Sequence, residues 1–222
     1  MLDISKVDDI KDFLYIIPAA AIVEFITLLL TRNAGQKPLF GVNSLNDWYD
    51  QFGIFAVSAD VLSLIIGVVG ARYIYSFFFN HIMEWSPLYF ILIVVLFQIA
   101  HDLFFYFAVV KQIPRGHNEM IDIFQEYGKE NGAKVVVVDA AMVIGTAVGA
   151  MYLKSYPDHI SFTVLLLLLY GICYSVFTRP PAPPPPPPPQ KKQVAEIDRS
   201  FMQESAMGPQ GLLIPQSSPA MY

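Results

Sequence analysis

Five apolar stretches, each about as long as the ~20 residues that a helix needs to cross a bilayer, constrain this chain most strongly. The chain has 222 residues and is 55% hydrophobic, and a water-soluble fold of that length has too little interior to bury so much apolar surface. We therefore predict an all-α fold, an integral membrane bundle of about five transmembrane helices. These helices are expected at Ile10–Thr31, Phe52–Phe79, Pro87–Lys111, Lys134–Leu153 and His159–Phe177.

Residues in and around these stretches indicate how the helices lie in the bilayer. Four aromatic residues near predicted helix ends are expected to act as interfacial anchors, namely Trp48, Tyr49, Trp85 and Tyr89. The fifth stretch has no Asp, Glu, Lys or Arg, and its leucines from Leu165 to Leu169 predict a lipid-facing helix. The acidic N-terminus does not resemble a signal peptide, so we expect the first stretch to remain as a span.

Positive charges in the connecting segments predict the orientation of the helices. One side would hold Arg32, Lys37, Lys111, Arg115, Lys129, Lys134, Arg179, Lys191, Lys192 and Arg199. The other side would hold only Lys6, Lys11 and Lys154. Because cytosolic loops are enriched in Lys and Arg, we expect a lumenal or external N-terminus and a cytosolic C-terminus.

Acidic residues occur inside four of the five stretches, namely Glu24, Asp60, Asp102 and Asp139. Gln98 and His101 accompany Asp102 in the third stretch. A carboxylate in hydrocarbon costs several kcal/mol on insertion scales, about 3 at the helix centre, so these groups should face other helices or a wet cavity. Arg72, in the second stretch, is the natural countercharge for one of these acids, and it could also extend to the interface.

Small residues on the second and fourth stretches predict where helices approach each other closely. Ser63, Gly67 and Ala71 share a helical face with Asp60. Ala141, Gly145 and Gly149 form a second row of small residues. Such rows allow two helix backbones to come close together in a membrane, so we assign these residues to helix packing.

Three functions fit the intramembrane polar residues. They could hold the helices together, form a proton or ion path, or act in catalysis through His101 and Asp102. Catalysis has the least support, because the adjacent side chains of His101 and Asp102 point about 100° apart on a helix and should not pair. The other histidines lie at span ends or in loops, and no nucleotide, nucleophile or zinc motif occurs. We therefore predict no enzymatic activity, no catalytic residue, no metal and no cofactor, with a structural role favoured over conduction.

The segment between the third and fourth spans predicts a short amphipathic helix. The turn at residues 113–118 contains Pro114 and Gly116, and Asn118 is a possible N-cap. Apolar residues then recur at helical spacing at Met120, Ile121, Phe124 and Tyr127. We expect this helix to lie at the cytosolic interface or against the bundle, and an ordinary surface linker is the simpler interpretation.

The composition changes after the fifth stretch, so we divide the chain into a bundle at residues 1–178 and a linker and tail at residues 179–222. The prolines from Pro183 to Pro189, with Pro180 and Pro181 before them, predict a polyproline II rod about 30 Å long. The remaining tail is polar and predicted to be disordered, apart from an apolar patch at Leu212, Leu213 and Ile214. It would either present a partner-binding peptide or be an unused tail.

Residues 97–106 (FQIAHDLFFY) and 113–122 (IPRGHNEMID) together resemble an uncharacterised multi-pass membrane protein family of nucleocytoplasmic large DNA viruses. Residues 58–60, 71–73 and 132–139 are similar to that family as well, so the resemblance covers roughly residues 51–154. It implies a component of the virion inner membrane beneath the capsid. The predicted partners are the lipid bilayer, other membrane or capsid proteins and further copies of this chain. The net charge of −5 argues against a nucleic-acid partner.

Overall fold

A computed structural model describes residues 2–33 and 44–179, and the regular structure in these residues is helical throughout. The elements in chain order are η1 (Ile10–Asp12), α1 (Phe13–Asn33), α2 (Ser44–Phe52), α3 (Ile54–Phe78), α4 (Pro87–Phe105), the π-helical turn η3 (Tyr106–Val110), α5 (Glu119–Asn131), α6 (Lys134–Leu153) and α7 (Asp158–Ser175). The predicted all-α fold is therefore confirmed.

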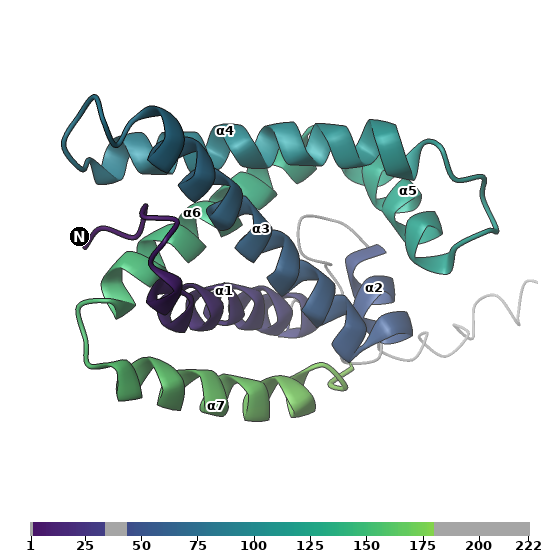
Figure 1. Ribbon diagram of the computed structural model, residues 1–222. Helices are drawn as coiled ribbons and strands as arrows, with labels where there is room; N and C mark the ends of the chain where they lie inside the picture. Colours follow the sequence, from purple (N-terminus) through teal and green to yellow (C-terminus); the bar gives the residue numbers. More distant parts are fainter. Residues whose placement is uncertain (1, 34–43, 180–222) are drawn as a thin grey trace, which may run out of the picture. The chain divides into compact units, whose positions relative to one another are not determined.

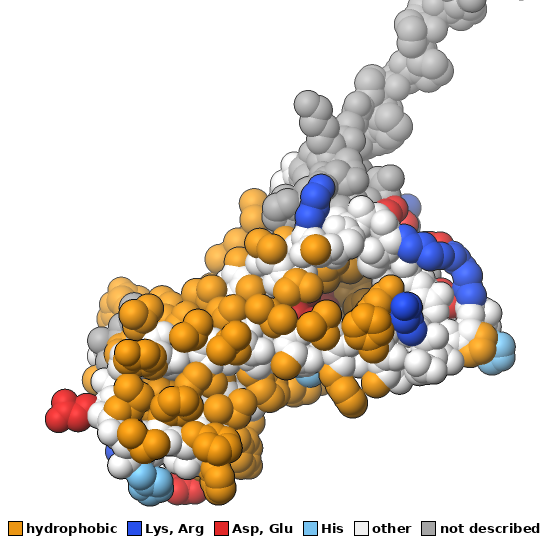
Figure 2. Space-filling model, turned by 90° about the horizontal axis from the view of Figure 1, so that it is seen from above, with side chains coloured by type: hydrophobic (Ala, Val, Ile, Leu, Met, Phe, Trp, Pro, Cys, Tyr) orange, Lys and Arg blue, Asp and Glu red, His pale blue; other side chains and the backbone are white. Residues whose placement is uncertain are grey.

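Five helices are long and apolar enough to cross a membrane: Ile10–Asn33, Ile54–Phe78, Pro87–Val110, Lys134–Leu153 and Asp158–Ser175. Their bounds agree with the predicted spans to within two residues at each end. The face of the molecule in Figure 2 is largely covered by hydrophobic side chains, with charged side chains mainly toward its two ends. This distribution is compatible with a multi-pass membrane protein, because lipid rather than water solvates the apolar outer surface.

The packing of the helices follows Figure 1, in which α1 lies between α6, α3 and α7. Helix α4 packs against α3 and α6 and completes the bundle. Helix α7 contacts the bundle chiefly through α1, and its Leu166, Leu167 and Leu169 side chains are exposed. The leucine run that we predict to face lipid is therefore exposed on the outer surface of α7 at these three positions.

The short helices α2 and α5 pack against each other at the end of the bundle where α1 ends and α3 begins. The predicted amphipathic helix is α5, and the Asn118 side chain caps it by accepting a hydrogen bond from the Ile121 N–H at 3.2 Å. Ile121 and Ile123 are buried, because α5 lies against α2, η3 and α6. Helix α5 therefore packs against the bundle at this end.

Helix α2 was not expected from hydropathy, because its nine residues include Asn46, Asp47 and Asp50. Gly53 separates α2 from α3 with a φ of +51°, a conformation that glycine adopts without strain. Trp48 and Tyr49 are 4% and 1% exposed, so the expectation that they are interfacial anchors is wrong. The turn at Gly53 folds α2 back so that both rings enter the bundle.

Candidate functional site

Two carboxyl groups of the bundle are bound by aromatic side chains of α2. The Tyr49 hydroxyl donates to Glu24 Oε1 of α1 at 2.8 Å, and the Trp48 indole Nε1 donates to Asp60 Oδ2 of α3 at 2.9 Å. Glu24 is completely buried, whereas Asp60 is half-buried. Helix α2 therefore supplies one hydrogen-bond donor to each of the two acids. Because Glu24 is completely buried, water cannot replace the donor from Tyr49.

The carboxyl groups of Glu24 and Asp60 lie close enough to each other to interact electrostatically. Glu24 Oε2 is buried and has no donor among the described residues. Among the described residues, the Tyr49 hydroxyl is therefore the donor on which the Glu24 carboxyl depends.

A second group of polar side chains lies on α4. Gln98 Nε2 donates to Asp102 Oδ1 at 2.7 Å, and His101 Nδ1 lies 3.3 Å from the same oxygen. The His101 ring lies parallel to the rings of Phe97 and Phe105, one turn to either side. The expectation that His101 and Asp102 do not pair is wrong, because rotation of both side chains brings their polar edges together despite their divergent Cβ directions.

The fourth acid, Asp139 on α6, is close enough to Asp60 and Asp102 to interact with both electrostatically. Tyr127 of α5 lies beside this group, and its pKa is raised by burial first and then by the charges of Asp139 and Asp60. The pKa of Tyr49 is likewise raised well above its ordinary value, by burial and by the Glu24 carboxyl. We call Glu24, Asp60, Asp102 and Asp139 the acidic layer.

The acidic layer lies toward the end of the bundle that carries α2 and α5. Asp60 is six residues from the first residue of α3, which corresponds to about 9 Å along the helix axis. Asp139 is five residues from the start of α6, and Asp102 is near the end of α4. The four acids predicted on separate helices therefore come together at one depth, where α2 covers Glu24 and Asp60.

Arg72 lies in a different place from the acidic layer, so the expectation that it is the countercharge for one of these four acids is wrong. Its Nη2 is 3.2 Å from Asp12 Oδ2 and donates to the backbone carbonyls of Lys6 and Asp9. Arg72 is twelve residues from Asp60, about 18 Å along α3 and beyond the reach of its side chain. The acid that neutralises Arg72 is at the start of the first span.

Lys154, at the end of α6, completes this second polar group. Its Nζ is 2.5 Å from Asp12 Oδ1 and donates to the Asp3 carbonyl at 2.7 Å. Asp12 is fully buried between the two cations, and the side chain of Arg72 is 1% exposed. We call Asp12, Arg72 and Lys154 the ion-pair layer. It fastens the N-terminal segment to α3 and α6.

Mostly apolar side chains separate the two polar layers, although the Gln98 amide oxygen reaches Gly67 within this part of α3. On each of three helices, two buried apolar residues lie between a residue of the acidic layer and one of the ion-pair layer. They are Ile16 and Ala19 on α1, Leu64 and Val68 on α3, and Val143 and Ala147 on α6. Each of them is at most 4% exposed. Thr146 is also buried at this level, but its hydroxyl donates to the Met142 carbonyl of its own helix at 3.0 Å.

Three of the predicted packing residues, Gly67, Gly145 and Gly149, lie at close helix contacts. A Cβ built on Gly67 would lie 2.5 Å from Gln98 Oε1 and 2.9 Å from Val143 Cγ2, so α3 is pressed against both α4 and α6. Gly145 and Gly149 face Val23 and Ala19 of α1. Ala71 is buried and Ser63 is half-buried, whereas Ala141 is exposed and belongs to no such contact.

Sequence reasoning missed the polar residues that lie outside the apolar stretches or at their margins. Arg32, expected only as a cytosolic charge, is 2% exposed and joins three helices. Its guanidinium pairs with Asp50 of α2 at 2.7 Å and donates to the Val176 carbonyl after α7 at 2.8 Å. A buried arginine next to a helix end is not distinguishable from a loop arginine by hydropathy.

The arrangement offers hydrogen bonds and ion pairs between helices. Within the described part of the chain, no three His, Cys, Asp or Glu side chains converge into a group that could hold a metal ion. The predicted tail residues Pro183, Pro189, Leu212, Leu213 and Ile214 lie outside the described residues. Comparison of the chain with protein-family models, with curated proteins and with solved structures gives no significant match.

Proposed function

We propose that this protein is a multi-pass membrane protein with a structural, non-enzymatic role, in which the buried polar groups fix the helix arrangement. The observation that carries the proposal is the separation of the acidic layer from the ion-pair layer by buried apolar residues. A proton or ion path needs polar groups or water throughout the span, whereas most of the described buried residues between the two layers are apolar. Hydrogen bonds between helices, in contrast, need only local partners.

The pairing within each layer supports the same role. Glu24 is bound to Tyr49, Asp60 to Trp48, and Asp102 to Gln98, so each of these contacts joins two helices or orders one helix face. Interhelical hydrogen bonds in a membrane contribute about 0.6 kcal/mol on average. Their main effect is therefore to select one packing of the helices.

The proposed site of action is a viral inner membrane, with capsid or other membrane proteins as partners. The support for this setting is the resemblance of residues 97–122, and the support for a cytosolic C-terminus is the excess of positive residues on that side. Chemical crosslinking in purified virus particles is the direct test. We expect the protein in the membrane fraction, crosslinked to a capsid or membrane component. Its absence from particles would refute the viral setting.

A small conducting protein is the second candidate, and one observation favours it. Asp102 Oδ2 and Gln98 Oε1 are buried and lack hydrogen-bond partners among the described residues. Such atoms are normally satisfied, so water could enter the acidic layer from the side of α4. Figure 2 shows a recess in the hydrophobic face, with an acidic side chain visible beside it.

Proton flux into liposomes separates the two candidates. Under the structural role, the wild-type protein does not dissipate an imposed pH gradient. Asp60→Leu then lowers the free energy of unfolding by about 1–3 kcal/mol, because the Trp48 indole loses its acceptor. The matched control is Asp47→Asn, on the exposed face of α2. A flux that Asp60→Asn abolishes and Asp47→Asn preserves would replace our proposal with conduction.

A further inference from the structure

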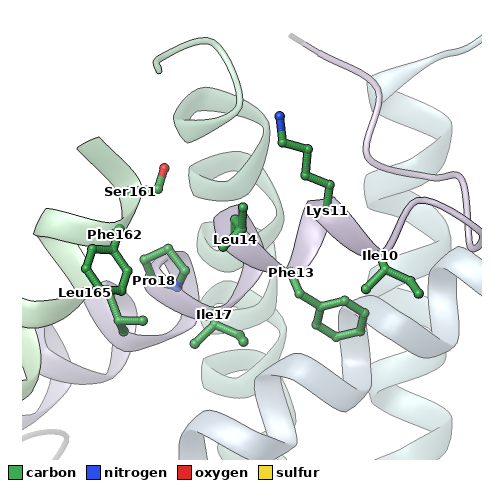
Figure 3. Close-up of a pocket in the computed structure, with 9 residues that line it drawn as sticks. All are labelled: Ile10, Lys11, Phe13, Leu14, Ile17, Pro18, Ser161, Phe162 and Leu165. Carbon is green, nitrogen blue, oxygen red and sulfur yellow. The ribbon is translucent and has the colours of Figure 1, made fainter. Parts of the chain in front are cut away.

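A groove lies between the first turns of α1 and α7, with a volume of about 380 Å³. It is lined almost entirely by apolar side chains, including Leu14, Ile17, Pro18, Phe162 and Leu165 (Figure 3). Leu14 and Phe162 are 42% and 56% exposed, so the groove opens on the outer surface of two spanning helices. In a membrane this surface meets lipid.

An ion pair stands at the mouth of the groove. Lys11 Nζ is 2.8 Å from Asp158 Oδ2, and the two side chains are 60% and 46% exposed. The Tyr15 hydroxyl donates to the other oxygen of Asp158 at 2.6 Å and fixes its position. Lys11 and Asp158 are the second and the first residues of their spans, so in a membrane the end of each span brings the pair to the level of the lipid headgroups.

One polar side chain lies deeper in the groove. Ser161 is one turn below Asp158, about 4.5 Å further along α7. It is fully buried, and its hydroxyl has no hydrogen-bond partner among the described residues. In Figure 3 the hydroxyl of Ser161 and the ammonium of Lys11 reach the same side of α1. A buried hydroxyl without a partner indicates a missing donor or acceptor at this position.

The groove therefore presents three kinds of group in order of depth. An exposed ion pair is followed by a single hydroxyl and then by apolar walls at Pro18 and Leu165. Because α1 and α7 begin at the same end of the bundle, this order is the same on both helices. It matches the order of headgroup, ester carbonyl and acyl chain in a phospholipid.

We propose that the groove binds one phospholipid with a zwitterionic headgroup. Its phosphate pairs with Lys11, its ammonium with Asp158, and an ester carbonyl accepts a hydrogen bond from Ser161. An acyl chain lies along Leu14, Pro18 and Leu165. Asp158 already neutralises Lys11, so an anionic lipid would bring its phosphate next to an uncompensated carboxylate. This inference requires the chain to lie in a membrane and is independent of the structural role proposed above.

Photocrosslinking of the full chain in nanodiscs tests the site. The probe is phosphatidylcholine with a diazirine in one acyl chain, added at a low mole fraction to unlabelled phosphatidylcholine. Crosslinks should map to peptides containing residues 10–18 and 161–165. Ser161→Leu, which fills the groove, should remove most of them. The control Thr163→Leu, on the exposed face of α7, should leave them unchanged.

A second variant keeps the proposal falsifiable if Ser161→Leu does not fold. Ser161→Ala keeps the groove open and should lower lipid occupancy about fivefold, the equivalent of one net hydrogen bond. Equal crosslinking of wild type and Ser161→Ala, at equal helicity, would overturn the assignment of the hydroxyl. Equal crosslinking of wild type and a folded Ser161→Leu would overturn the site.

The headgroup is tested with diazirine-labelled phosphatidic acid at the same mole fraction. We expect it to crosslink less than phosphatidylcholine in the wild type. Asp158→Asn should reduce or reverse this preference, because the carboxylate that repels a second negative charge is gone. An equal or greater yield with phosphatidic acid in the wild type would overturn the zwitterionic assignment.

Discussion

Replacing Tyr49 with phenylalanine removes the hydrogen bond between α2 and Glu24 without changing the shape of the ring. The hydroxyl donates at 2.8 Å, and both residues are at most 1% exposed, so water cannot take its place. Glu24 Oε1 would then lose its hydrogen-bond donor, and Glu24 Oε2 has none among the described residues. Leaving a buried acceptor unpaired costs about 1–3 kcal/mol, so Tyr49→Phe should destabilise the fold by that amount.

Glu24→Gln provides the comparison for this variant. The glutamine amide keeps the hydrogen bond from Tyr49, because its oxygen accepts it, and the substitution removes a carboxyl group from beside Asp60. We expect a change within about 0.5 kcal/mol of wild type. In the double variant, the cost of Tyr49→Phe should persist, because the amide oxygen is also left without its donor.

The assay is reversible unfolding of the full chain in mixed micelles, followed by tryptophan fluorescence. Trp48 lies beside Asp60 and reports the release of α2 directly. The matched control is Tyr73→Phe, because Tyr73 is 61% exposed on α3. If Tyr49→Phe unfolds within about 0.5 kcal/mol of both wild type and Tyr73→Phe, α2 is not held by the acidic layer, and the reasoning is refuted.

Three further predictions concern other parts of the bundle. Arg72→Met should lower the free energy of unfolding by about 3–5 kcal/mol, because it leaves buried Asp12 with one cation; a loss below about 1 kcal/mol in equilibrium unfolding would contradict the ion-pair layer. Gly67→Ala should destabilise the fold by about 1–3 kcal/mol, because the added methyl group would collide with Gln98 of α4. The control is Gly128→Ala, whose added methyl group has its nearest neighbour atom at 3.6 Å and should be neutral or slightly stabilising. Thermal unfolding followed by circular dichroism measures both variants. The pKa of Tyr127 is raised in the fold, so its neutral form stabilises the protein below the ordinary tyrosine pKa of about 10, and this contribution is lost as the pH rises further. Tyr127→Phe should therefore reduce the loss of stability above pH ~10. Tyrosinate absorbance of this variant should show one fewer late-titrating group.

Local sequence patterns were sufficient for the spans. Hydropathy and length locate the five long helices to within two residues at each end, because each span must bury its own backbone hydrogen bonds and present apolar side chains to lipid. The Asn118 cap and the apolar spacing of α5 are local as well, and the structure contains both. The acids at Glu24, Asp60, Asp102 and Asp139 were recognisable because a carboxyl group in an apolar run is conspicuous.

The pairing of these polar residues could not be read from the same patterns. Asp60 is twelve residues from Trp48, Glu24 is 25 from Tyr49, and Arg72 is 60 from Asp12. A helical period shows which face a side chain occupies, but it does not show which other helix lies opposite that face. Helix α2 could not be predicted either, because its sequence is polar. Its burial depends on the turn at Gly53 and on the acids of other helices.

The sequence by itself determined that the chain forms five apolar helices and that four of them carry an acid, since the bilayer's length and its exclusion of unpaired polar groups apply to each segment separately. Only the tertiary structure decided that the acids meet at one end of the bundle beneath α2, that Arg72 belongs with Asp12 and Lys154, and that buried apolar residues lie between. These contacts depend on the order and rotation of the packed helices. In a membrane, the order and rotation of the helices depend on close packing and hydrogen bonding between specific helix faces. The sequence of one helix does not show which face of another helix it will meet.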